Sequence, residues 1–167
     1  LRANAFHAES LTLDLGGLLS QHDAIINLNS NQLIAELKLA GQWLKQQQNW
    51  AFTLNQGSLQ YPETGAWHLA QPASGEVSAT QQRIDKQCWQ NHQASLCLNA
   101  SQQQQRVLAN VQLSQLPIDY FEQWLPNNVR ISTALNMTLN TDYDLNQPLP
   151  ELQAAISLDK GTVIYQE

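Results

Sequence analysis

The sequence predicts an all-β protein built around a long antiparallel or mixed sheet, with one short helix. Three observations lead to this prediction. Apolar side chains recur at every second position along most of the 167-residue chain, which is the pattern of strands with one buried and one solvated face. Turn-forming residues separate these runs, and only one segment has the i, i+3, i+4 spacing of a helix. The sheet is therefore expected to have little helix available to cover its apolar face.

The first half of the chain is expected to form six strands. The first alternating run ends at Gly16-Gly17, and Asn55-Gln56-Gly57 is expected to form a turn between two later strands. Residues 71–86 are rich in Ser, Thr, Gln, Gly and Pro, so a long loop or irregular edge is expected there. The six predicted strands cover residues 11–15, 24–28, 33–39, 50–54, 58–61 and 67–69.

The second half is expected to contain further strands on both sides of the helix. Pro117 opens the helical segment 117–125, and Pro126 stops it. Its aromatic side chains, Tyr120, Phe121 and Trp124, are expected to pack on the sheet. The predicted strands cover residues 96–98, 107–113, 131–139, 152–158 and 163–165, and the whole chain is expected to have ten to twelve.

The only two cysteines, Cys88 and Cys97, are expected to form a disulfide. The residues between them are turn-rich, and Leu96-Cys97-Leu98 has the pattern of a returning strand, so the two side chains can face each other across a hairpin. Their spacing matches neither a zinc site nor a thioredoxin-like redox motif. Two buried free thiols are the remaining alternative. A disulfide indicates an oxidising compartment outside the cytoplasm.

Composition and motifs argue against several classes of function. The net charge is −6 and the eight Lys and Arg residues are scattered singly, so nucleic acid is not expected as a partner. No catalytic triad, phosphate-binding loop or zinc-protease motif is present, which predicts a protein that is not an enzyme and has no cofactor. The segment 140–146 has acidic and amide side chains but lacks the Gly and Glu of a calcium loop, so we interpret it as a turn without a metal. No run reaches the roughly 18 apolar residues of a membrane span.

Alternation leaves one open question, namely what covers the apolar faces of the strands. Two sheets could close on each other as a sandwich, or one sheet could fold over and leave a hydrophobic trough. Counting apolar residues does not separate these options. The chain begins at Leu1 rather than at a methionine, and we expect it to be a fragment of a longer protein.

The order of several motifs resembles the C-terminal half of the TamB family. These motifs are Cys88-Trp89 followed by Leu96-Cys97-Leu98, then the helix between Leu116-Pro117 and Leu125-Pro126, then the alternating run 131–165 with its interruption at Asn146-Gln147-Pro148. The resemblance covers roughly residues 85–167, and the earlier residues share only the alternating style. TamB is the inner-membrane-anchored, periplasm-spanning subunit of the translocation and assembly module.

The resemblance implies a taco-like half-pipe with an apolar interior, formed by residues 1–167 as a single β-groove domain. It also implies a non-enzymatic role in outer-membrane biogenesis and protein secretion, in the periplasm and as part of an inner-membrane-anchored protein. TamA, an Omp85-type outer-membrane protein, is the implied partner. The implied cargo is either phospholipid acyl chains or outer-membrane β-barrel substrates such as autotransporters.

We expect the inward member of each alternation to line the groove and bind lipid or substrate. Phospholipid transport is the preferred function, because acyl chains held without directional bonds can slide. The alternatives are a chaperone or scaffold for barrel insertion without lipid carriage, and an unrelated extracellular β-sandwich that binds a ligand. The expected groove residues are Leu11, Leu13, Ile26, Leu28, Leu37, Leu39, Phe52, Leu54, Val111, Leu113, Leu135, Met137, Leu139, Ile156 and Leu158.

Overall fold

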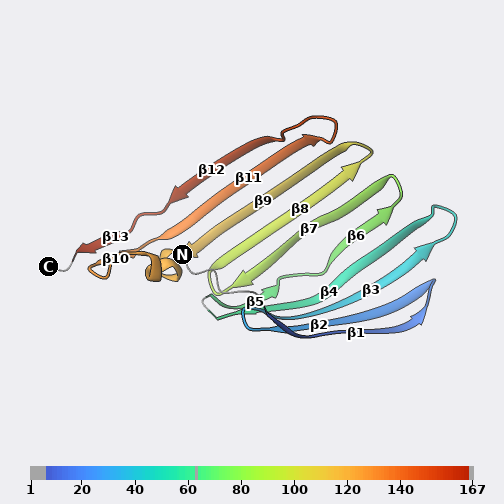
Figure 1. Ribbon diagram of the computed structural model, residues 1–167, viewed down its shortest axis with the longest axis horizontal. Helices are drawn as coiled ribbons and strands as arrows, with labels where there is room; N and C mark the ends of the chain where they lie inside the picture. The colour runs from blue at the N-terminus through green and yellow to red at the C-terminus, as the bar shows by residue number, and fades with distance from the viewer. Residues whose placement is uncertain (1–6, 63, 166–167) are drawn as a thin grey trace.

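The computed structural model describes residues 7–62 and 64–165, which form one broad sheet, a small two-stranded sheet and a short helix (Figure 1). The helix, η1 (Ile118–Trp124), is a 3₁₀ helix between the ninth and tenth strands. In chain order the strands are β1 (Ala8–Leu18), β2 (Gln21–Ser30), β3 (Ile34–Leu44), β4 (Asn49–Tyr61), β5 (Gly65–Leu69), β6 (Ala73–Ser78), β7 (Gln81–Asn91), β8 (Ala94–Gln103), β9 (Arg106–Pro117), β10 (Val129–Ser132), β11 (Ala134–Asp144), β12 (Glu151–Leu158) and β13 (Thr162–Tyr165).

The large sheet is a meander in which most strands pair with their neighbours in sequence. Its order is β1-β2-β3-β4-β5-β7-β8-β9-β11-β12, while β10 and β13 form the small sheet. Every pairing between the described strands is antiparallel. The all-β prediction is therefore confirmed, and of the two sheet types expected, the antiparallel one is found.

Two short strands share the space between β4 and β7. β5 pairs with the C-terminal end of β4, and β6 pairs with its N-terminal end. The predicted loop at residues 71–86 is therefore wrong, because β6 and the start of β7 occupy it. The strand pattern of β6 is weak in the sequence because the ring of Phe52 on β4 leaves no room for a side chain at Gly75. A Cβ there would lie 2.8 Å from Cε1 of Phe52 and even closer to Cζ.

Bulges reverse the side-chain alternation in β4, β7 and β9, and the register also shifts near the start of β1. In β4 the register shifts opposite Lys38 and Leu39, so Asn55 belongs to a bulge within a continuous strand and the predicted turn there is wrong. Similar shifts occur in β7, between Ile84 and Gln87, and in β9, where Gln115 has a φ of 56°. The extra residue of a bulge shifts the inward–outward alternation by one position, so apolar residues of opposite parity before and after it face the same side of the sheet. It also bends the strand locally.

The helix predicted over residues 117–125 is present at Ile118–Trp124, and it is a 3₁₀ helix. Tyr120 and Phe121 pack against a cluster of buried side chains near this end of the sheet. The side chain of Trp124 lies outside the described residues. The cluster consists of Leu54, Trp67, Trp89, Ala94 and Leu116.

The two outer strands of the large sheet leave apolar side chains in water. β1 pairs only with β2, and β12 pairs only with β11, in the part of the chain that the structure describes. Leu11 on β1 and Ile156 on β12 are each 68% exposed. The sheet therefore has two uncovered edges and a core concentrated near its middle.

Candidate functional site

One face of the large sheet is apolar across its whole width, and we call it the inner face. Residues directly opposite each other in a ladder share a face. One row runs from Ile156 through Met137 and Leu113 to Leu96 and Trp89. Another row, on the other half of the sheet, joins Leu15, Ala24, Leu39, Leu54 and Ala73.

The inner face is hollowed into a trough with a volume of about 730 Å³. Its lining comes from the seven strands β3 to β9 together with Thr64, and most of the lining side chains are aliphatic or aromatic. Among the described residues, no large side chain is fully buried. Two tightly packed sheets would bury such side chains completely, so the sandwich alternative is wrong for this chain.

Aromatic rings form part of the trough floor, and glycines make room for them. The indole of Trp89 extends from β7 across the inner face to Gly57 on β4, where a Cβ would lie 2.9 Å from Cζ3 of the indole and closer still to Cη2. Trp67 on β5 lies in the same buried cluster, and its indole N–H donates a hydrogen bond to Oγ1 of Thr64 (3.2 Å). Both rings are less than a tenth exposed, at 8% for Trp67 and 7% for Trp89.

The structure brings together five of the fifteen expected groove residues. Leu37, Leu39, Phe52, Leu54 and Leu113 line the trough. Ladder pairing places the others on the same inner face but outside the trough, most of them on strands closer to the two edges of the large sheet. These ten are Leu11, Leu13, Ile26, Leu28, Val111, Leu135, Met137, Leu139, Ile156 and Leu158. A role in binding stays a prediction for all fifteen.

Several trough residues are absent from the expected set, and a bulge accounts for two of them. Trp67, Trp89 and Leu96 lie in short apolar patterns that the sequence shows, and they could have been included on that basis. Ile84 and Gln87 have opposite parity within β7, yet both line the trough because the bulge lies between them. No feature of the sequence alone indicates that reversal.

The disulfide prediction is confirmed, since Cys88 and Cys97 are joined directly across β7 and β8 with Cα atoms 4.0 Å apart. Their neighbours Trp89 and Leu96 are opposite each other on the inner face. The bond therefore lies on the opposite face, which we call the outer face. It fixes the register of two strands that supply the trough floor.

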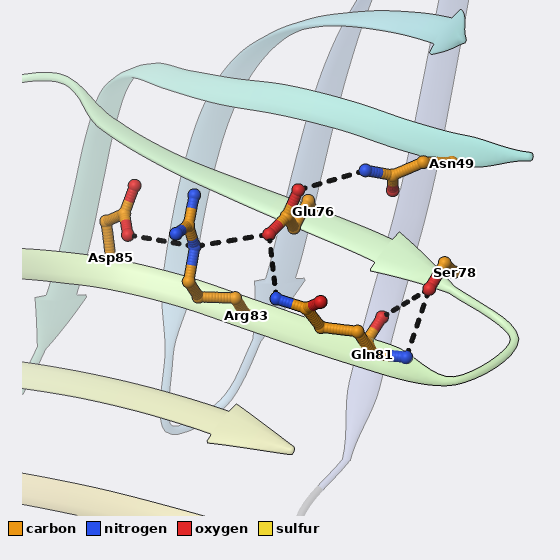
Figure 2. Close-up of polar contacts among 6 residues, drawn as sticks. All are labelled: Asn49, Glu76, Ser78, Gln81, Arg83 and Asp85. Atoms are coloured by element: carbon orange, nitrogen blue, oxygen red, sulfur yellow. Dashed lines mark hydrogen bonds and ion pairs between the residues drawn. The ribbon is translucent and has the colours of Figure 1, made fainter. Parts of the chain in front are cut away.

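Polar and charged side chains from β4, β6 and β7 contact one another on the outer face (Figure 2). Glu76 accepts hydrogen bonds from Nδ2 of Asn49 (2.9 Å) and Nε2 of Gln81 (3.2 Å), and its carboxylate lies 3.4 Å from Nε of Arg83. The same nitrogen of Arg83 is 3.3 Å from Asp85. These contacts join three strands on the outer face and leave the trough without a charged side chain in its lining.

Another ion pair joins β9 to β11. Nε and Nη2 of Arg106 donate hydrogen bonds to the two carboxylate oxygens of Asp142, at 2.8 and 2.5 Å. Hydrogen bonding from Arg106 lowers the pKa of Asp142, and the same contact raises the pKa of Arg106. Both groups are open to solvent, so the pair marks the polar surface rather than a reactive site.

The described residues offer no arrangement for metal chemistry, since no three His, Cys, Asp or Glu side chains gather closely enough to hold an ion. No helix in residues 7–62 or 64–165 has the length and apolar character to cross a membrane. Chemically, the trough can shelter an apolar ligand from water.

One family model matches the chain. It is described as the N-terminal domain of TamB, and it covers residues 1–167. The match supports the expected family but not the expected C-terminal half, because the model describes the other end of the family's proteins. The prediction that the chain comes from the C-terminal half, made from the motif order at residues 85–167, is therefore not supported. No solved structure matches the chain.

Proposed function

The chain belongs to the TamB family, and we propose that its trough shields the acyl chains of phospholipids from water as they pass between the two membranes of the cell envelope. Membership of the family implies a role in outer-membrane biogenesis and a protein that is not an enzyme. In this proposal the domain lies in the periplasm, as part of a protein anchored in the inner membrane, and works with TamA.

The observation that carries the proposal is the apolar trough of about 730 Å³ on the inner face. This volume lies within the range of about 300–1,000 Å³ that is typical of ligand pockets. Each CH₂ group removed from water contributes about 0.8 kcal/mol, so an acyl chain gains affinity along its length. Contacts with Leu, Phe and Trp side chains have no fixed direction, which allows a bound chain to slide.

The lining favours a lipid over an extended polypeptide. A polypeptide carries an N–H and a C=O at every residue, and each such group costs free energy when it is buried without a partner. The trough offers few polar side chains, among them Thr64 and Gln87, and it presents strand faces rather than free strand edges. An acyl chain makes no such demand.

The first experiment measures lipid bound to the purified 167-residue chain. Mass spectrometry should detect phospholipid after exposure to envelope lipids, and brominated phospholipid should quench the fluorescence of Trp67 and Trp89. Leu113→Asp places a charge in the trough and should abolish binding. Gln112→Asp places the same charge on the exposed outer face one residue away and should leave binding intact. Equal binding by both variants, or no lipid on the unmodified chain, would refute the proposal.

A second candidate function rests on the uncovered edge of β12. Leu152 and Leu158 are 61% and 57% exposed there, and a free edge can pair with an added strand. In this alternative the domain is a scaffold that receives a strand of an outer-membrane β-barrel protein. Photocrosslinkers on β12 should then capture such a substrate, whereas crosslinkers at Leu113 should not.

A further inference from the structure

Gln87 is a polar side chain placed inside the apolar trough. It lies on β7, two residues before Trp89, and pairs directly with Leu98 on β8. The bulge after Ile84 is what brings it to the inner face, because Ile84 and Gln87 would face opposite sides of a regular strand. The bulge thus places an amide in a row that continues with Leu98 and Val111, next to the row that contains Trp89.

The amide of Gln87 is held in one orientation. The indole N–H of Trp89 donates a hydrogen bond to its Oε1 (3.3 Å). An indole N–H can only donate, so the oxygen of the amide must face it and the NH₂ group must face away. Trp89 itself is fixed, because its ring is 7% exposed and lies against Gly57.

The NH₂ group of Gln87 donates to no atom in the part of the chain that the structure describes. Among the other polar lining groups, Oγ1 of Thr64 accepts a hydrogen bond from the indole of Trp67, Oγ of Ser74 contacts Thr53 on the outer face, and Tyr61 is 39% exposed. The trough therefore offers a ligand an oriented, neutral hydrogen-bond donor.

We infer that Gln87 anchors the ester carbonyl of a bound phospholipid. The inference rests on the proposed function and specifies which part of the lipid is recognised. A carbonyl oxygen accepts the N–H without bringing a charge into the trough, whereas an ionised fatty acid would bury a carboxylate in a lining with no cation. One donor suits a lipid, which carries its carbonyls at one end of long apolar chains.

The test compares a diester phospholipid with a diether phospholipid that has the same chains and headgroup but no carbonyl. Exchange from vesicles onto the full 167-residue chain gives the ratio of the two affinities. Since a net hydrogen bond changes affinity by roughly 2- to 10-fold, the unmodified chain should prefer the diester by about that factor. Gln87→Met should reduce the ratio of diester affinity to diether affinity to about one.

The matched control is Gln112→Met, which makes the same replacement on the outer face and should keep the preference. Because the readout is a ratio within one protein sample, a partly unfolded variant does not distort it. Equal binding of both lipids by the unmodified chain would overturn the role of Gln87 while leaving the trough as a lipid site. Binding of neither lipid would overturn the proposed function itself. If a strand-forming peptide displaced the diester and lost affinity in Gln87→Met, the ligand would be a polypeptide and the inference would be wrong.

Discussion

Replacing Gly57 by alanine should displace Trp89 from the trough floor. A Cβ at this position would lie 2.9 Å from Cζ3 of Trp89 and 3.3 Å from Cδ2 of Leu37, with Cη2 of Trp89 closer still. Real Cβ atoms do not approach carbon this closely, so the indole must move. The indole is packed against the buried cluster that contains Leu54, Trp67 and Leu116, so moving it disrupts these contacts.

The expected cost of Gly57→Ala follows from two contributions. Overpacking a well-filled site costs about 1–3 kcal/mol. Loss of the hydrogen bond from Trp89 to Gln87 costs about another 0.5–1.5 kcal/mol. A strand glycine replaced by alanine gains about 0.5–1 kcal/mol, so the net loss in the free energy of unfolding should be about 0.5–4 kcal/mol.

Urea denaturation, followed by circular dichroism, measures this loss. Gly16→Ala is the matched control, because a Cβ there meets nothing within 4 Å and the strand should be unchanged or slightly more stable. Trp89→Phe provides the decisive background, since its shorter ring does not reach Gly57. The cost of Gly57→Ala should be clearly smaller in that background. An equal cost in both backgrounds would show that the ring and the glycine are not in contact.

Three further outcomes test other features. Reducing Cys88–Cys97 should lower the free energy of unfolding by roughly 2–3 kcal/mol on the chain-entropy model, and an unchanged urea midpoint with and without reductant would contradict this. Arg106 lowers the pKa of Asp142 in the folded chain below its value in the unfolded chain. The ion pair therefore stabilises the folded chain at pH values above the unfolded pKa, and this stabilisation is lost as the pH falls through the folded pKa. Asp142→Asn should therefore destabilise the chain at neutral pH but not in strong acid, as thermal melts at the two conditions would reveal. Gln104 has a φ of 53° in the turn between β8 and β9, a left-handed conformation that glycine adopts without strain. Gln104→Gly should therefore raise the free energy of unfolding by roughly 0.5–1 kcal/mol. A decrease would show that contacts of the Gln104 side chain stabilise the turn by more than the backbone strain costs.

The sequence predicts the fold class well because alternation is a property of each strand by itself. The alternation in β3 and β9 predicts inward-facing Leu37, Leu39 and Leu113, and these three side chains line the trough. The disulfide was predictable for the same reason, since Cys88 and Cys97 are close in sequence and separated by a turn. Local signals of this kind do not depend on the rest of the sheet.

The parts that were not predicted depend on contacts between strands. Gly75 looks like a loop residue, yet it is small because the ring of Phe52 lies over it from the neighbouring strand. Asn55 looks like a turn residue, yet it belongs to a bulge that the pairing of β3 with β4 defines. The trough floor consequently includes Trp89, whose contact with Gly57 spans two strands that are distant in sequence.

The exposure of the inner face leads to a final prediction about the occupied trough. In the described chain no large side chain is fully buried, so much of the apolar surface that would stabilise a closed protein still faces water. A ligand that covers this surface binds the folded chain and not the unfolded one, and it must raise the free energy of unfolding. Phospholipid at 100 times its dissociation constant should raise it by about 2.7 kcal/mol. Urea titrations with and without lipid measure the increase, and Leu113→Asp should lose it while Gln112→Asp keeps it. If lipid bound to the chain but left the urea midpoint unchanged, the lipid would be binding the unfolded chain equally well, and the trough would not be its site.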